Sequence, residues 1–328
     1  MWKYIIKRIL LSILILLCVT FVIYTLLRCL PSSFVESMAV TLSQAPGAKS
    51  YEEWLAQLNA SYGLDIGIIP GYIRWLSQFV RGEFGDSWRY VMPVVDKFKE
   101  VIGVSLVMGG ISFVLELVIA IPLGIMAATR QYSKTDYVIT AGALIGISLP
   151  PFFFATLLKL IFASGLGWFD LYGLVGRDYA QLSPMGQFWD MASHLVLPIA
   201  TLVITSIGSL MRYTRTNMLE VLNADYIRTA RAKGLPEKKV IYRHAFRNTL
   251  IPLVTIIGGS LPGLFSGALI TETLFSIPGI GFTSYEAMTR GDIPFAMFYL
   301  TFIAVLTLAG NLIADILYAA VDPRVRIS

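Results

Sequence analysis

Charged side chains are scarce in the long apolar stretches of this sequence, so those that occur there are candidates for chemistry. Glu116 lies near the middle of the apolar stretch 103–128. An ionised carboxylate is unfavourable in hydrocarbon, and such residues often mark a path for ions or solutes. Glu116 is therefore a candidate pathway residue that could meet the cationic end of a solute. The alternative is a structural carboxyl group that is protonated or hydrogen-bonded to a neighbouring helix.

Three further charged residues lie near the ends of apolar stretches. Glu272 could help form an external gate or receive a partner protein, or it could make a simple structural hydrogen bond. Lys159 and Asp315 are expected to extend toward the membrane interface, as charged side chains near the ends of spans commonly do.

Patterns for covalent or metal chemistry are weak. Ser148 and His194 could be a nucleophile and its base, but Ser148 is expected at mid-membrane and His194 at the outer edge. Cys18 and Cys29 lie too far apart along one helix for a disulfide, and they form no zinc-binding cluster with the two histidines. The nucleotide-binding pattern G-x-x-x-x-G-K-[ST] does not occur in the sequence. The sequence predicts no catalytic or metal-binding residues and no enzyme.

Prolines interrupt several apolar stretches beside glycine and serine. Pro150 closes the run 146–150, which includes Ser148, and Pro262 lies in the run 258–263. Proline removes a backbone donor and kinks a helix, which membranes tolerate where neighbours or a water-lined cavity satisfy the freed carbonyl groups. These positions are therefore candidates for hinges or gates. Close helix packing through small residues is the alternative, and the two interpretations are compatible.

One polar segment, residues 218–252, is too polar to span a membrane. A glycine at position 234 and a proline at 236 predict a helix stop, hence two short helices. Small residues in the first helix would let a partner surface approach closely. We interpret this helix as a docking element made of Asn223, Ala224, Asp225, Tyr226, Ile227, Arg228, Thr229, Ala230, Arg231, Ala232, Lys233 and Gly234. A topology-setting basic loop or an interfacial helix on anionic lipid is the alternative.

The elements that must position these residues are membrane helices. Of the 328 residues, 56% are hydrophobic and 14% are charged, against about a quarter charged in soluble domains. A bilayer is crossed by about 20 apolar residues in a helix. Stretches of that kind occupy residues 9–27, 103–128, 137–163, 194–210, 250–275 and 295–320. The sequence predicts an all-α membrane protein with about six transmembrane helices.

Basic residues predict the orientation of these helices, because short cytoplasmic connections are enriched in Lys and Arg. The N-terminal tail, the connection around Arg130, the segment 211–249 and the C-terminal tail 321–328 carry this excess. All four fall on one side of a six-span arrangement, so both termini are expected in the cytoplasm. The net charge of +5 is mild and does not favour nucleic-acid binding.

Residues 31–100 are then expected outside the cell. Apolar and aromatic residues recur at helical spacing within 50–59 and within 71–80. Because Trp and Tyr favour the headgroup zone, we expect short amphipathic helices that cap the bundle. The predicted division is therefore the first helix with its tail (1–30), this external segment, and a five-helix core over 101–320 that contains a cytoplasmic loop at 216–248.

Several runs resemble one family. Asp225–Gly234 and Arg247–Pro252 resemble the coupling loop of ABC-importer membrane subunits in its peptide-importer version. The family's general loop pattern agrees at Gly234 and Ala230 but departs at residues 244–247, which lack its Leu-Pro pair. Further runs resemble the same branch at residues 4–8, 27–31, 63–65, 74–76, 82–87, 121–124, 148–152, 272–281 and 322–324. The long external segment resembles that of the B-type subunit among the two paired permeases of oligopeptide and dipeptide systems.

The resemblance implies a type I ABC importer permease fold and a place in the bacterial plasma membrane. Its partners would be a second homologous permease subunit, two cytoplasmic ABC ATPases that carry ATP and Mg²⁺, and an extracytoplasmic solute-binding protein. The chain itself would hold no cofactor and would form half of a path for peptides. Residues 223–234 would sit in a groove of an ATPase, while the external segment, 164–193 and 276–291 would receive the binding protein.

Two other functions remain open at this point. Related subunits carry nickel or other small solutes, so peptide is the less secure part of the interpretation. A stand-alone secondary transporter would need ionisable relays in several spans, whereas Glu116 is essentially the one mid-span candidate. Such a transporter would also leave the polar segment 218–252 unexplained.

Overall fold

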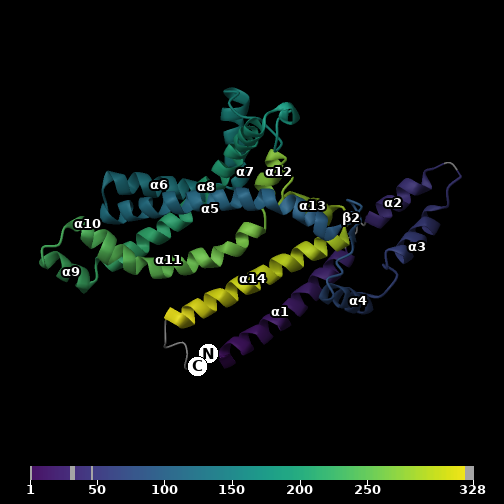
Figure 1. Cartoon of the computed structure of the whole chain (residues 1–328), viewed down its shortest axis with the longest axis horizontal. Helices are drawn as coiled ribbons and strands as arrows, with labels where there is room; N and C mark the ends of the chain where they lie inside the picture. Colours follow the sequence, from purple (N-terminus) through teal and green to yellow (C-terminus); the bar gives the residue numbers. More distant parts are fainter. Residues whose placement is uncertain (1, 30–33, 46, 322–328) are drawn as a thin grey trace. The chain divides into compact units, whose positions relative to one another are not determined.

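The computed structural model describes residues 2–29, 34–45 and 47–321, and these are largely helical (Figure 1). Within this part of the chain, four helices are long and apolar enough to cross a membrane, or up to six if each of two bent helix pairs forms one span. The prediction of an all-α membrane protein is confirmed. The predicted tail residues 322–328 and the side chain of Asp315 lie outside the described residues.

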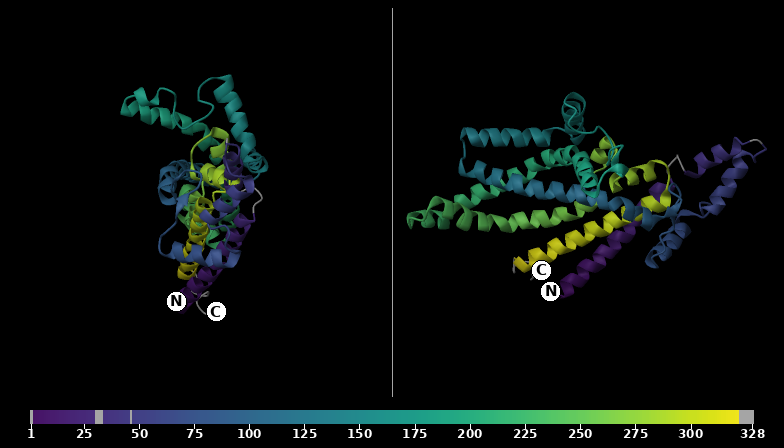
Figure 2. Two further views of the ribbon diagram at one scale, coloured as in Figure 1. Left: turned by 90° about the vertical axis from the view of Figure 1, so that its right-hand side faces the viewer. Right: turned by 45° about the horizontal axis from the view of Figure 1, so that its top comes forward.

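The first of two compact units comprises residues 1–103 and 280–328. Helices α1 and α14 pack against each other within it (Figures 1 and 2). A two-residue antiparallel ladder, which the sequence analysis did not predict, joins β1 (Asp86–Ser87) to β2 (Met92–Pro93). The helices of this unit are α1 (Trp2–Arg28), α2 (Phe34–Ser43), α3 (Tyr51–Ser61), α4 (Ile68–Val80), α13 (Ile280–Thr289) and α14 (Ile293–Val321), with residues 94–103 of α5.

The two helices predicted in the external segment are confirmed as α3 and α4. A capping box starts α3: the Ser50 hydroxyl accepts from the Glu53 backbone N–H, and the Glu53 carboxylate accepts from the Ser50 N–H. The apolar face of α3 packs through Leu58 on α2. In α4, the buried Tyr72 hydroxyl donates to the Leu17 carbonyl oxygen at 3.0 Å, which ties this helix to α1.

The second compact unit comprises residues 104–279. Its long helices are the rest of α5 and the 39-residue α8, and shorter helices lie between and after them. The elements are α5 (Val94–Thr129), α6 (Lys134–Ser148), α7 (Pro151–Leu158) with a π-helical continuation Lys159–Gly165, a 3₁₀ turn Tyr179–Gln181, α8 (Pro184–Leu222), α9 (Asp225–Ala232), α10 (Glu237–Lys239), a π-helical turn Val240–Phe246, α11 (Arg247–Ser260), a 3₁₀ helix Leu261–Phe265 and α12 (Leu269–Phe275).

Glycines allow α6 and α8 to pack closely. A Cβ on Gly146 would lie 2.7 Å from the Ile204 carbonyl oxygen, and a Cβ on Gly208 would overlap the Ala143 carbonyl oxygen. Real Cβ atoms essentially never approach other heavy atoms within 3.0 Å, so neither position has room for a side chain. Small-residue packing is therefore present in the run 146–150.

Two predicted spans are broken rather than continuous. The stretch predicted at 137–163 bends by 103° between α6 and α7, because Pro150 and Pro151 cannot extend the helical ladder of α6. The stretch predicted at 250–275 divides into α11, a 3₁₀ helix and α12, with Pro262 and several glycines at the break. Apolar length predicted the extent of these spans, while Pro150 and Pro262 marked the positions of the breaks as candidate hinges.

Candidate functional site

The predicted docking helix is present as α9. It lies at one end of the second unit, beside the connection between α5 and α6 (Figure 1). Gly234 ends it with φ at +74°, a conformation that favours glycine. The second short helix was predicted wrongly. After Pro236, α10 continues through the π-helical turn into α11 without a loop, because no further glycine or proline stops it before Pro252.

Two faces of α9 have different environments. Ile227 and Ala230, three positions apart, are 0% and 7% exposed and pack with Met218 and Val240. The prediction that Ala230 admits a partner needs correction, because its side chain faces this chain's own interior. We call the remaining residues the outer face of α9: Asp225, Tyr226, Arg228, Thr229, Arg231, Ala232 and Lys233, all exposed.

A polar cavity of about 470 Å³ adjoins the outer face of α9. Arg231 donates to Glu237 at 2.7 Å, and this hydrogen bond holds the pKa of the Glu237 carboxyl below its ordinary value. Arg130, from the connection between α5 and α6, lines the same cavity. Basic residues from two separate connections therefore meet at one end of this unit, as the charge pattern predicted.

A buried ion pair between α6 and α8, near this end of the unit, was not predicted. The Nε and Nη2 atoms of Arg215 in α8 donate to the two oxygens of Asp136 in α6, both at 2.8 Å. The Tyr132 backbone N–H donates to the same carboxylate at 3.0 Å. The sequence analysis counted Arg215 only as part of the basic segment 211–249, because nothing local links two residues 79 positions apart. The pair fixes the end of α8 from which α9 projects.

A second cavity, of about 340 Å³, surrounds Glu116. The Glu116 side chain is half-buried, and Ser206 of α8 lines the same cavity. Among the described residues that line this cavity, Glu116 is the one with an ionisable side chain. The other polar and small lining residues are Ser105, Gly109, Ser112, Thr205, Ser206, Ser260, Gly263 and Gly267. The carboxylate therefore lines a cavity whose wall is largely apolar, with several hydroxyl groups and glycines, and the pathway role of Glu116 stays a prediction.

The other proposed gate residues lie elsewhere or at the edge of this cavity. Ser148 and Pro150 are exposed at the bend between α6 and α7 and do not line it. Pro262 belongs to the 3₁₀ helix beside the lining residue Gly263, while its own side chain lies outside the described residues.

Both ring nitrogens of His194 have partners other than Ser148. Its Nδ1 lies 2.8 Å from the Asp190 carbonyl oxygen, and its Nε2 lies 3.3 Å from the Asp170 carboxylate. The side chain is almost fully buried. His194 therefore links α8 to the segment before it.

Glu272 is fully buried in the first turn of α12. Its carboxylate accepts from the Ser105 hydroxyl at 2.7 Å and from the Ala268 backbone N–H at 3.0 Å. Gly279 packs so closely on this carboxylate that a Cβ there would overlap it. This placement favours the structural alternative over direct contact with a partner protein. Since Ser105 and Ala268 also line the Glu116 cavity, Glu272 supports one wall of it.

Lys159, predicted to reach the membrane interface, makes contacts within its own unit. Its Nζ donates to the Leu274 carbonyl oxygen at 2.6 Å and lies 3.7 Å from the centre of the Tyr172 ring. The carbonyl is near the end of α12, where helix carbonyl groups lack helical partners. A nearby acceptor and an aromatic face therefore hold this ammonium group inside the unit.

The fold and the projecting α9 define a class of membrane transport component. In the methionine ABC transporter MetNI, solved in inward-facing conformations, a chain aligns with a TM-score of 0.52 at 15% identity, covering 69% of this chain and 98% of that one. This likeness confirms the predicted ABC importer permease fold.

Sequence comparison identifies the family. Residues 120–327 match the binding-protein-dependent transport system inner membrane component, and this chain belongs to that family. The oligopeptide transport system permease protein AppB of Bacillus subtilis is 38% identical over 326 residues, 99% of each chain. The dipeptide transport system permease protein DppB of Escherichia coli K12 is 32% identical over 342 residues, again 99% of each chain. The chain is therefore a multi-pass inner-membrane transport component.

Proposed function

We propose that this chain is the B-type permease subunit of an ATP-driven importer and forms half of a path for peptides. The observation that carries the proposal is full-length similarity to oligopeptide and dipeptide permeases, combined with an exposed helix at the predicted coupling position. A second homologous permease would complete the path. Two cytoplasmic ATPases would bind ATP and Mg²⁺, and both termini of this chain would be cytoplasmic.

In this proposal the outer face of α9 rests in a groove of an ATPase. The buried residues of α9 hold the helix rigidly on its own chain, because Ile227 and Ala230 pack against Ile125 of α5 and Met218 of α8. Motion of α9 would therefore move both long helices together. Rigid-body changes of this kind need packed contacts that transmit displacement.

The segments predicted to be external would receive the solute-binding protein. Within the first unit, the hairpin of β1 and β2 presents Val91, 86% exposed and at φ +50°. Asp292 fixes the base of this hairpin by accepting from the Ser87 hydroxyl and from the Trp88 and Arg89 N–H groups. An exposed apolar tip on a fixed base is suited to protein contact. Residues 164–193 and 276–291 remain further candidates.

Uptake by the reconstituted assembly tests the proposal. The proteoliposomes contain this chain, its paired permease and both ATPases, and they are supplied with the binding protein. They are expected to accumulate labelled oligopeptide only when ATP is present on the side that corresponds to the cytoplasm. Excess unlabelled peptide should compete, and excess Ni²⁺ should not. Competition by Ni²⁺ together with no competition by peptide would assign the chain to the nickel alternative.

Glu116→Gln is expected to lower uptake of peptides that carry a free N-terminal ammonium group. A charge-assisted hydrogen bond contributes roughly 1.5–3 kcal/mol, so kcat/KM should fall roughly tenfold or more. N-acetylated peptides should be transported equally by both proteins. The matched control is Glu220→Gln, an exposed carboxylate near the end of α8. Equal loss for free and acetylated peptides would favour a structural role for Glu116.

A further inference from the structure

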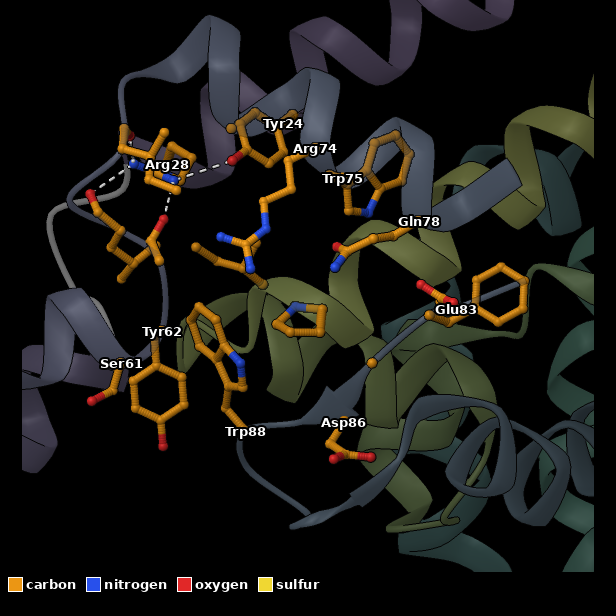
Figure 3. Close-up of a pocket in the computed structure, with 18 of the residues that line it drawn as sticks. Tyr24, Arg28, Ser61, Tyr62, Arg74, Trp75, Gln78, Glu83, Asp86 and Trp88 are labelled. Atoms are coloured by element: carbon orange, nitrogen blue, oxygen red, sulfur yellow. Dashed lines mark hydrogen bonds between the residues drawn. The ribbon is translucent and has the colours of Figure 1, made fainter. Parts of the chain in front are cut away.

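A third cavity lies entirely within the first unit, and none of the roles above uses it (Figure 3). Its volume is about 360 Å³. It forms where the end of α1 meets α4. The two helices are so close there that a Cβ on Gly71 of α4 would overlap the Tyr24 hydroxyl. Its aromatic and charged walls comprise Tyr24, Tyr62, Trp75, Trp88, Arg28, Arg74, Glu83 and Asp86.

Two guanidinium groups converge on one side of this cavity. Arg28 donates to the carbonyl oxygens of Leu64 and Ile66 at 2.8 and 2.7 Å and to that of Gly63 at 3.4 Å. The Nη1 of Arg74 lies 3.9 Å from the point that a Gly63 Cβ would occupy. Both cations therefore approach Gly63, and in residues 2–29, 34–45 and 47–321 neither has a carboxylate partner. Two cations so placed attract an anion.

The opposite side of the cavity is acidic. Figure 3 shows Arg74 and Gln78 extending into the cavity, with Arg28 on one side and Glu83 and Asp86 toward the other. Aromatic rings line the space between. The cavity thus presents a positive end, an aromatic middle and a negative end, which is the pattern that a zwitterion matches.

The position of the cavity at the end of a candidate span indicates a site near the membrane surface. Arg28 ends α1, whose residues 6–28 form a candidate span. On α4, Ile69, Ile73 and Val80 are 63%, 61% and 78% exposed. Their spacing places them on one face, and such an apolar stripe on a short helix suits contact with lipid. Tyr and Trp around the cavity also match the headgroup zone.

We propose that this cavity binds the headgroup of a zwitterionic phospholipid. The phosphate diester meets Arg74, whose guanidinium has no hydrogen-bond or ion-pair partner in the part of the chain that the structure describes, while Arg28 adds positive charge. Planar guanidinium donors match phosphate oxygens. The ammonium group of the headgroup lies toward Glu83 and Asp86, and aromatic rings beside it are favourable for a cation. A bound lipid would then hold the external helices against the end of α1.

Fluorescence titration of the full-length chain, purified with its partner subunits in detergent, tests this site. The probe is dihexanoylphosphatidylethanolamine, and the signal comes from tryptophans that include Trp75 and Trp88 in the cavity wall. We expect saturable binding that Arg74→Gln weakens roughly tenfold, through loss of a charge-assisted contact worth about 1.4 kcal/mol. Arg81→Gln is the matched control, an exposed arginine just after α4 that does not line the cavity.

A second variant tests the negative end. Glu83→Gln combined with Asp86→Asn should reduce the preference for the ethanolamine lipid over dihexanoylphosphatidylglycerol, which lacks the ammonium group. The proposal is overturned if R74Q and R81Q bind the lipid equally. It is also overturned if inorganic phosphate or the dipeptide Ala-Ala displaces the lipid at equal concentration, since the site would then take any anion or a peptide.

Discussion

Ala232→Trp is expected to abolish ATP-driven uptake while the folded chain remains in the membrane. Ala232 is exposed on the outer face of α9, whereas Ile227 and Ala230 make the packed contacts. A bulky ring at position 232 therefore has space within this chain and clashes only with a partner. Overpacking a close interface is unfavourable by roughly 1–3 kcal/mol, enough to weaken ATPase binding about five- to 150-fold. Co-purification of the ATPase and uptake measure the effect.

The control for this variant is Ala56→Trp. Ala56 is an exposed alanine on α3, on the side predicted to be external. Ala56→Trp adds the same side chain without meeting the ATPase, so co-purification of the ATPase should persist. Ala230→Trp is not a suitable test, because the ring would disrupt the chain's own packing. Undiminished ATPase binding and uptake by Ala232→Trp would contradict docking through this face.

Glu272→Ala is expected to lower the free energy of unfolding by roughly 3–5 kcal/mol and to reduce the yield of monodisperse protein. The substitution leaves the Ser105 hydroxyl and the Ala268 N–H without their buried acceptor. Each buried donor left without its acceptor costs roughly 1–3 kcal/mol, so two such donors account for an effect of this size. Gly279→Ala should act through the same contact, because its Cβ would overlap the carboxylate. Thermal unfolding in detergent provides the measurement.

The matched control is Gly110→Ala, at a helical glycine of α5 with open space around its Cβ position. Alanine has the higher helix propensity, so stability should be unchanged or slightly raised. Loss of transport by Glu272→Ala without any loss of stability would point instead to the gate role first considered for Glu272.

Much of the helical architecture is predictable from local pattern. Long apolar stretches predict membrane helices because the bilayer leaves no alternative partner for the backbone. Ser50 and Glu53 start α3 through a capping box, a local signal that the sequence analysis did not use. Gly234 marks the end of α9 because a left-handed residue closes the helix. These features depend on residues close together in the sequence.

Features that depend on distant residues were missed. Pairing of Asp136 with Arg215, burial of Ala230 and the carbonyl contact of Lys159 all join elements far apart in sequence. The charge and size of a side chain do not reveal whether it faces a partner or its own chain. The cavity between α1 and α4 was not predicted either. The amphipathic pattern of residues 71–80 indicates the apolar face of one helix, but it does not indicate that Arg28 and Arg74 converge.

Photo-crosslinking from position 229 tests the central claim most directly. Thr229 lies exposed on the outer face of α9, so a photoreactive residue there should join this chain to its ATPase in intact membranes, while the same group at position 56 should not. Capture of the ATPase from position 229 alone is the predicted result. Labelling of position 229 by a membrane-impermeant reagent added outside intact cells would place α9 on the wrong side and contradict the mechanism.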